Sequence, residues 1–326
     1  MALTKTYDVA GNREDLTDVL TILEPEATPV TSLAKKGKAS GTFFEWQADS
    51  LDEVSFGGVQ EGADASFGAG ADKASNRAKL GNYIQKIRRE YQVSDLQQAV
   101  DTAGVPSEFA NAQAKSVREC KRDLEAAICS ADDRAADNGT NQPYRTRGFF
   151  KWLGADGTQP SDIPAAFQNV ANDSTATQTE ATFNSVLQEL YEANGMPGSQ
   201  LTLVAGPELK RQISDFARSE GTTTSTPYQI TQLAESKKIT LTVNFYEGDF
   251  GNVAIVPSTF LNRSSSAPGT ADTDAGLLLD PEYFGLHTLI AESTNELENR
   301  GGGRRGYVDL VAGLAVYSPK AHGYFA

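Results

Sequence analysis

The sequence predicts a mixed α+β protein, in which a long β-hairpin and one long helix precede a compact α/β region. Two strand-like segments at 42–47 and 83–93 flank a stretch rich in Gly and Ala. Residues 107–137 repeat apolar side chains at helical spacing, and helix and strand patterns alternate from 180 to 256. The chain has 326 residues, of which 39% are hydrophobic and 22% are charged, so it can form about two ordinary domain cores.

The first 40 residues are predicted to form an extended arm. They contain Pro25 and Pro29, scattered Thr and Asp, and only brief apolar clusters such as the one at 19–23. A single chain offers such a segment little to pack against, so its ordering entropy is poorly compensated.

Residues 41–93 are predicted to form a long hairpin. The segment TFFEWQ at 42–47 is one strand, and the second, at 83–93, places Tyr83, Ile87 and Tyr91 on one face. Between them, GGVQEGADASFGAGAD has no apolar pattern from which to build a core.

The two limbs of this hairpin differ in charge. The descending limb has no basic residue between Lys38 and Lys73, and the ascending limb has no acidic residue from Lys73 to Arg89. The limbs either pair with each other or meet complementary neighbours in an assembly, and we hypothesise the second. The proposed inter-subunit residues are Glu45, Asp49, Asp52, Glu53, Glu61 and Asp64 on the acidic limb, and Lys73, Arg77, Lys79, Lys86, Arg88 and Arg89 on the basic limb.

Residues 107–137 are predicted to form one amphipathic helix about 45 Å long, at 1.5 Å per residue. Ser107 is a plausible N-cap, and Asn138-Gly139 is a stop signal. We interpret the charged face as solvated, with a docking surface as the alternative. We expect Cys120 and Cys129 to be buried, reduced and unpaired, because nine helical residues place them on opposite faces. The charged face comprises Arg118, Lys121, Arg122, Glu125, Asp132 and Asp133.

The α/β region is predicted to begin after Pro164. A helix at 180–194 leads to a strand from Leu201 and a second helix from Pro207. A third short helix with Ile230 and Leu233 precedes strands at 239–246 and 253–256. After a polar loop, short strands at 277 and 286 lead to a last strand at 307–317.

Composition argues against several functions. A net charge of −14 argues against general electrostatic binding of nucleic acid. No apolar run is long enough to span a membrane, and the N-terminus lacks the pattern of a signal peptide, so we expect no membrane association.

Catalytic and metal-binding patterns are also missing. The GxGxxG spacing of Gly301, Gly303 and Gly306 precedes a strand, whereas a dinucleotide site needs a following helix, so we predict a turn there. His287 and His322 are the only histidines, and neither has other ligands at metal-binding spacing. We expect no enzyme activity, no cofactor and no metal.

The order of these parts resembles the major capsid proteins of tailed bacteriophages, which have the Hong Kong 97 fold. Local strings carry the same resemblance: TPVTSLAKKGKA and FFEWQADSL near the start, LVAGPELKRQI and FYEGDFGNVAIVPSTFL in the α/β part, and LLLDPEYFGL before the final strands. The resemblance implies an N-terminal arm at 1–40, an extended E-loop hairpin at 41–93, a peripheral domain at 94–164 with its spine helix at 107–137, an axial α/β domain at 165–285, and C-terminal strands at 286–326 that return to the peripheral domain.

The resemblance also implies a function. The chain is expected to assemble in the host cytoplasm as hexamers and pentamers of an icosahedral virion shell, enclosing double-stranded DNA without sequence-specific binding. Any scaffold would be a separate protein, like a portal or a decoration protein, because no long charged helical preface exists. No covalent crosslink is expected, since Lys73 and Lys79 are the only candidate lysines of the loop and no partner is identifiable. The alternatives are an encapsulin-like compartment shell and a small-molecule enzyme on the α/β part.

Overall fold

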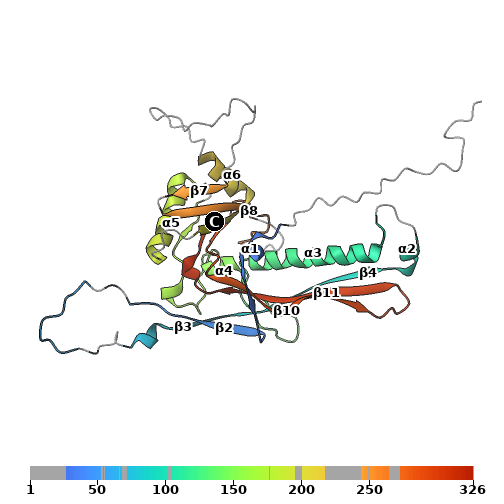
Figure 1. Cartoon of the computed structure of the whole chain (residues 1–326), viewed down its shortest axis with the longest axis horizontal. Helices are drawn as coiled ribbons and strands as arrows, with labels where there is room; N and C mark the ends of the chain where they lie inside the picture. The colour runs from blue at the N-terminus through green and yellow to red at the C-terminus, as the bar shows by residue number, and fades with distance from the viewer. Residues whose placement is uncertain are drawn as a thin grey trace, which may run out of the picture.

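The chain folds around two main sheets, from which a two-stranded hairpin projects (Figure 1). The computed structural model describes residues 27–52, 54, 56–65, 67, 72–100, 105–175, 177–194, 200–216, 244–248, 250–263 and 272–325. The hairpin extends to one side of the four-stranded sheet, and the tip of that sheet extends to the other (Figure 1).

The four-stranded sheet has the order β1-β10-β11-β4. Its long antiparallel ribbon joins β10 (Phe284–Leu297) to β11 (Arg304–Val316) through a turn in which Gly301 and Gly303 have positive φ angles. β4 (Gln85–Val93) pairs antiparallel with β11, and β1 (Lys35–Lys38) pairs parallel with β10. The GxGxxG glycines therefore belong to a strand-to-strand turn and its following strand, as predicted.

One helix, α3 (Glu108–Ile128), lies along this sheet over β4 and β11 (Figure 1). The Ser107 hydroxyl accepts a hydrogen bond from the Ala110 amide, which confirms the predicted N-cap. Its buried stripe includes Phe109, Cys120 and Leu124. A short helix, α2 (Asp95–Ala99), precedes it, and α1 (Pro29–Leu33) packs against it.

The predicted end of this helix was wrong, because α3 stops at Ile128, nine residues before 137. Beyond Cys129 the backbone of Ala135 pairs with that of Arg145, and Asp132 and Asp133 bond the side chains of arginines 145 and 147. These long-range bonds replace the hydrogen bonds that further helical turns would make. The 21-residue helix therefore spans about 32 Å.

Both cysteines are buried and free, as predicted. Cys120 lies within α3, whereas Cys129 is the C-cap residue. Burial raises the pKa of the Cys120 thiol to about 11, which disfavours a reactive thiolate.

The hairpin proper consists of β2 (Phe43–Ala48) and β3 (Ala78–Tyr83), paired antiparallel from Phe43–Tyr83 to Ala48–Ala78. A single 3₁₀ turn, η3 (Lys73–Asn76), precedes β3. The predicted second strand at 83–93 is therefore divided. The break falls at Ile84, which is buried and donates its amide to the Thr42 carbonyl, and β4 then joins the other sheet.

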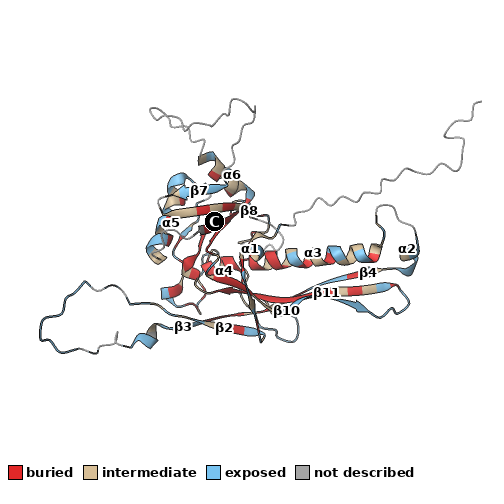
Figure 2. Cartoon of the chain, in the orientation of Figure 1, coloured by how far each residue is buried: buried red, intermediate tan, exposed pale blue. Residues whose placement is uncertain are grey.

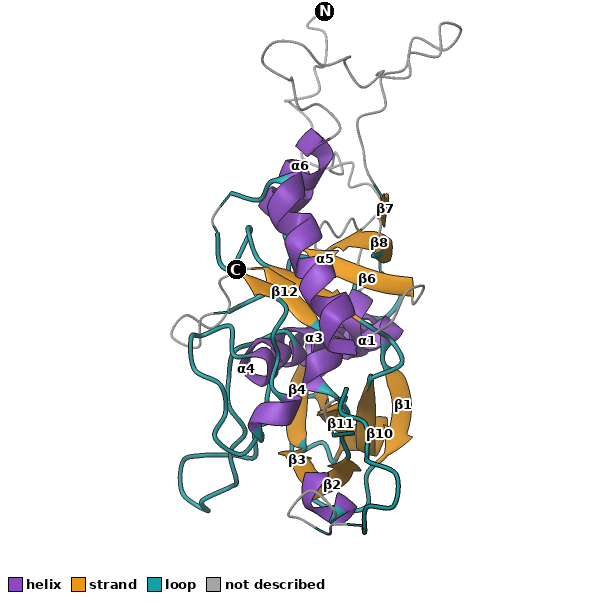
Figure 3. Cartoon of the chain, turned by 90° about the vertical axis from the view of Figure 1, so that its left-hand side faces the viewer, coloured by secondary structure: helices purple, strands orange, loops and turns teal. Residues whose placement is uncertain are grey.

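The α/β region is built on a six-stranded sheet of order β5-β12-β9-β6-β8-β7. Helix α5 (Glu180–Asn194) has the predicted bounds, and α6 (Pro207–Phe216) begins at the predicted proline. Figure 3 shows both helices beside strands of this sheet, in a layer separate from β10 and β11. The strands are β5 (Asn172–Asp173), β6 (Gln200–Ala205), β7 (Phe245–Gly248), β8 (Gly251–Pro257), β9 (Gly276–Leu279) and β12 (Gly323–Phe325).

The C-terminal segment is shared between the two sheets. β11 packs against α3 and pairs with β10, whereas β12 pairs with β5 and β9 in the α/β sheet. The expectation that all strands of 286–326 return to the peripheral part was wrong for β12, because Phe325 is fully buried against Phe183 in the α/β core. The predicted helix with Ile230 and Leu233, and the start of the strand at 239–246, lie outside the described residues.

Three clusters of buried apolar side chains hold these layers together. The largest joins α3, the four-stranded sheet and the short α4 (Phe149–Leu153), and the second lies within the α/β region. The third is small and packs Phe44 and Ile84, at the base of the hairpin, against Val311 of β11. Figure 2 shows burial concentrated in these layers and exposure along the projecting loop of the hairpin. The 3₁₀ turns η4 (Ala165–Phe167) and η5 (Pro319–Ala321) complete the described elements. None of the helices in the described ranges has the length and apolarity needed to cross a membrane.

Candidate assembly surfaces

The loop between β2 and β3 exposes an unusual set of large apolar side chains. Phe56 is 97% exposed and Leu51 98%, while Phe67 is 88% exposed. Val54 and Val59 lie in the same loop and are similarly exposed. Burying large exposed apolar side chains against a neighbour is favourable, so this loop is a candidate contact surface.

Three ion pairs connect the two limbs of the hairpin. Lys79 Nζ lies 2.8 Å from a Glu45 oxygen, Arg77 lies 3.4 Å from Asp49, and Lys73 bonds Asp52. The bond from Lys73 lowers the pKa of the Asp52 carboxyl. Exposed pairs contribute only about 0–1 kcal/mol each. Pairing within the chain is therefore present, and the predicted contacts with neighbours remain a hypothesis.

Two of the remaining acidic candidates are placed in the projecting loop. Glu61 and Asp64 are both exposed there, whereas Glu53 lies outside the described residues. The structure thus places two predicted contact residues beside the exposed apolar side chains.

The other three basic candidates do not lie on the hairpin. Lys86 and Arg88 extend from β4 to Asp309 of β11, at 3.2 Å and 2.6 Å. The Arg88 guanidinium makes two hydrogen bonds to Asp309 and, as the main cause, lowers the pKa of that carboxyl. Arg89 makes the equivalent pair of bonds to Asp123 of α3, at 2.6 and 2.7 Å. These residues join strand to strand and strand to helix, and sequence reasoning missed their acidic partners.

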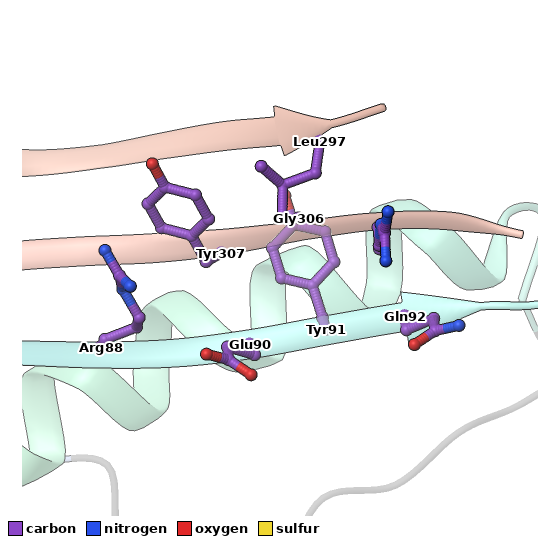
Figure 4. A pocket seen from close by; sticks show the side chains of 8 residues that line it. Arg88, Glu90, Tyr91, Gln92, Leu297, Gly306 and Tyr307 are labelled. Atoms are coloured by element: carbon purple, nitrogen blue, oxygen red, sulfur yellow. The ribbon is translucent and has the colours of Figure 1, made fainter. Parts of the chain in front are cut away.

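An open groove of about 490 Å³ lies where β4, β10 and β11 run together (Figure 4). Arg88 stacks over the Tyr307 ring at 4.4 Å, and Tyr91 lies against Gly306. The lining mixes cations, aromatic rings and amides, so it suits a polar peptide surface better than an apolar ligand. The lining residues are Arg88, Glu90, Tyr91, Gln92, Leu297, Arg305, Gly306 and Tyr307.

The base of the hairpin is held by a buried polar network. Asn82 is fully buried, and its amide donates to the Leu314 carbonyl (2.7 Å) and to the Thr146 hydroxyl (3.0 Å). Its oxygen accepts from the Arg147 and Tyr83 amides, each at 2.9 Å. The Arg147 side chain is also buried and bonds two aspartates. Such a fully bonded network fixes the direction in which the hairpin leaves the sheet.

A buried carboxylate attaches the N-terminal arm to α3. The Glu125 oxygens accept hydrogen bonds from the Val30 and Thr31 amides, both at 2.8 Å, and from the Thr31 hydroxyl. Burial raises the pKa of the Glu125 carboxyl, and the bonds from α1 offset part of that rise. The prediction that Glu125 lies on a solvated face was wrong, because α1 covers it completely.

Neither histidine is arranged for chemistry. His322 is fully buried, and burial lowers its pKa to about 4; its Nδ1 accepts a hydrogen bond from the Asp280 amide at 3.2 Å. His287 stacks on Phe44 and bonds the Tyr317 hydroxyl at 3.0 Å. Within the part of the chain that the structure describes, no cluster of three His, Cys, Asp or Glu could hold a metal ion.

Known proteins match this architecture and sequence. The major capsid protein of Escherichia phage Phieco32 is 28% identical over 130 residues, which make up 40% of this chain and only 36% of that relative. Among solved structures, the capsid of Cyanophage A-1(L) superposes with a TM-score of 0.66 at 13% identity, covering 98% of this chain and 97% of that one. The SrpI encapsulin of Synechococcus elongatus PCC 7942 gives 0.55 at 9% identity, covering 100% and 95%.

At these identities the solved structures show the fold, and they confirm the predicted α+β architecture of the Hong Kong 97 type. The SU10 major capsid protein family, described by its own sequence model, matches residues 3–326. Because that match runs over nearly the whole length, the chain belongs to the SU10 major capsid protein family and is a structural protein of a phage capsid shell.

Proposed function

We propose that this chain assembles in the host cytoplasm as hexamers and pentamers of an icosahedral virion shell that encloses double-stranded DNA. The observation that carries the proposal is the projecting loop, whose apolar side chains find no partner within the described chain. Burying one such side chain contributes about 1.5–3 kcal/mol, so copies that cover each other's loops gain stability. Closed symmetry then repeats the same contact around the shell.

The domain roles follow the family resemblance. The four-stranded sheet with α3 corresponds to the peripheral domain, and the six-stranded sheet corresponds to the axial domain around the symmetry axes. The hairpin corresponds to the E-loop. The DNA is held inside without sequence-specific contacts, consistent with a net charge of −14. Scaffold, portal and decoration proteins, where they take part, are separate chains.

We also propose that the hairpin charges act between subunits. Glu61 and Asp64 stand beside the apolar loop residues, where they would direct the loop towards a basic surface of a neighbour. The pairs of Lys73, Arg77 and Lys79 are exposed enough to exchange partners during assembly. The buried Asp309 side chain binds Lys86 and Arg88, so those two cations stabilise the four-stranded sheet from which the hairpin projects.

An encapsulin-like compartment is the second candidate, because an encapsulin shares the fold. The family match favours the phage shell over it. We propose no catalytic activity, in keeping with the positions of both histidines and the open, mixed lining of the groove.

Electron microscopy of the purified full-length protein, with an assay for nuclease-protected DNA in particles from infected cells, tests the proposal. The variant Phe56→Ser/Phe67→Ser should lose most closed shells. Leu96→Ser is the matched control, since Leu96 is 81% exposed but lies on α2. Normal shells from the double variant would show that the loop is not an assembly element. Protected protein cargo without DNA would favour the compartment instead.

A further inference from the structure

Strand β1 forms one edge of the four-stranded sheet and is strongly basic. Its sequence is KKGK, all three lysines are exposed, and no other described strand pairs with its outer side. Lys35 donates a hydrogen bond to the Glu282 carbonyl at 3.1 Å. The side chains of Lys36 and Lys38 make no ion pair or hydrogen bond with another described residue. Lysines on an open edge discourage pairing with a similar edge, and these two leave their charge available to an acidic partner.

Lys36 and Lys38 lie on the same face of β1, about 7 Å apart along the strand. Side chains alternate between the faces of a strand, and Gly37 stands between the two lysines. A Cβ added to Gly37 would meet the His287 ring at 2.8 Å, so position 37 faces that ring. The two lysines therefore project from the opposite face, as a pair of like charges.

The neighbouring sequence supplies no carboxylate to this lysine pair. No acidic residue occurs between Glu26 and Glu45, on either side of β1. Residues 285–288 of β10 pair with β1 and carry no negative charge. Glu282 lies before that stretch, where its carbonyl binds the first lysine of β1, and the next acid, Glu292, already pairs with a lysine of α3. The positive charge of the pair is thus not balanced locally.

The projecting loop has the opposite arrangement of charge. Glu61 and Asp64 are exposed and make no ion pair with another described residue, and the sequence at 39–72 contains no basic residue. A backbone hydrogen bond of 3.1 Å closes residues 60–63, and Gly62 has a φ of 84°, as in a tight turn. The ends of such a turn lie within about 7 Å of each other. The two carboxylates therefore match the two lysines in sign, number and approximate spacing.

The loop is held away from β1 of its own chain. β2 and β3 are paired over six positions, from Phe43–Tyr83 to Ala48–Ala78, and this ladder is about 20 Å long. The loop begins only beyond the end of the ladder. Figure 1 shows it at the far end of the hairpin, well separated from β1. A contact between the two charged pairs therefore requires a second copy of the chain.

We propose that Glu61 and Asp64 of one subunit bind Lys36 and Lys38 on the edge strand β1 of a neighbouring subunit. The inference rests on the proposed assembly and names the surface that receives the loop. Each exposed charge pair is weak, so these charges select the position and orientation of the loop on its neighbour. The exposed apolar side chains of the loop then supply most of the stability of the contact.

Mixing two oppositely reversed chains tests this contact. Full-length Lys36→Glu/Lys38→Glu and full-length Glu61→Lys/Asp64→Lys should each assemble about tenfold more slowly than wild type at about 0.01 M salt, as measured by light scattering. An equimolar mixture should recover most of the wild-type rate, because each chain then meets partners of opposite charge. At about 1 M salt, where the Debye length falls to about 3 Å, the differences should disappear.

A charge-matched control separates this contact from an effect of net charge. Lys115→Glu/Arg300→Glu reverses two exposed cations elsewhere and should keep the wild-type rate. Equal slowing in this control, or no recovery in the mixture, would overturn the proposal. It would also be wrong if reversal of the β1 lysines left the assembly rate unchanged but lost nuclease-protected DNA, because the lysines would then bind phosphate.

Chemical crosslinking gives a second readout that does not depend on rates. Chains carrying Glu61→Cys are mixed with chains carrying Lys38→Cys, assembled, and treated with a short bis-maleimide. A crosslinked dimer should appear on a denaturing gel, whereas Glu61→Cys mixed with Lys115→Cys should give none; both native cysteines are buried. Closed shells without the dimer would refute this inference and leave the proposed function standing, whereas a wild type that forms no shells would refute the proposed function. If the charge-reversed chains fail to fold, the crosslink alone decides.

Discussion

Substitution of Glu125 by Gln should weaken the attachment of the arm to α3. The carboxylate accepts three hydrogen bonds from two residues of α1, and the Gln side chain keeps its shape while replacing one acceptor oxygen by a donor NH₂. At least one donor of α1 then lacks its acceptor. The Val30 amide belongs to a fully buried residue, and an unsatisfied buried donor costs about 1–3 kcal/mol. We therefore expect a loss of about 2 kcal/mol in the free energy of unfolding near neutral pH.

The pH dependence of this loss tests whether burial of the Glu125 carboxyl is the main influence on its pKa. Burial raises the pKa of Glu125 above 4.5, so the folded chain binds this proton more readily than the unfolded chain. The stability that this group contributes is fully present below 4.5 and is lost as the pH rises through the raised pKa. Gln does not titrate. The cost of the substitution should therefore be larger at about pH 5 than at about pH 8.

Urea unfolding of the unassembled chain at both pH values measures the two costs. Glu119→Gln on the same helix is the control, because Glu119 is partly exposed, and its cost should stay within about 0.5 kcal/mol. A cost for Glu125→Gln that grows as the pH rises would refute the reasoning. It would show that the hydrogen bonds from α1 outweigh burial and hold the carboxyl ionised.

Three further predictions concern pH, crosslinking and charge. Burial lowers the pKa of His322 from 6.5 to about 4, so the folded chain keeps this side chain neutral where the unfolded chain protonates it. The free energy of unfolding should therefore fall by about 3 kcal/mol as the pH drops through this range. Urea unfolding measures this, and an equal pH dependence in wild type and His322→Gln would contradict it. Particles boiled in detergent should run as one band near 34.9 kDa, since Lys73 and Lys79 bond carboxylates of their own chain, and a ladder that survives reduction would show crosslinking. The variant Lys73→Glu/Arg77→Glu/Lys79→Glu should assemble more slowly than wild type at low salt, as measured by light scattering, because complementary charges speed the encounter of subunits. If the variant assembles at the wild-type rate, these charges only face solvent and do not act between subunits.

Local sequence determined the elements whose causes are local. Helix α5 has the predicted bounds, because its apolar spacing and Asn-Gly stop act within the segment itself. The start of α3 directly after its N-cap Ser107 follows from one hydrogen bond, which the Ser107 hydroxyl accepts from the amide three residues later. The long hairpin was likewise readable from two strands around a loop that cannot form a core.

The tertiary structure decided the ends of elements and the partners of charges wherever distant segments compete for the same backbone groups or charged side chains. α3 ends at Ile128 because the loop after it bonds to Arg145, and β4 separates from the hairpin because β11 offers a longer partner. Arg88 and Asp309 are 221 residues apart in the chain, and the register between β4 and β11 brings them together. A local sequence pattern does not determine that register. Glu125 looked like one more surface charge until α1, 95 residues earlier in the chain, covered it. Burial of a polar side chain depends on what packs against it, so this contact could only be found in the folded chain.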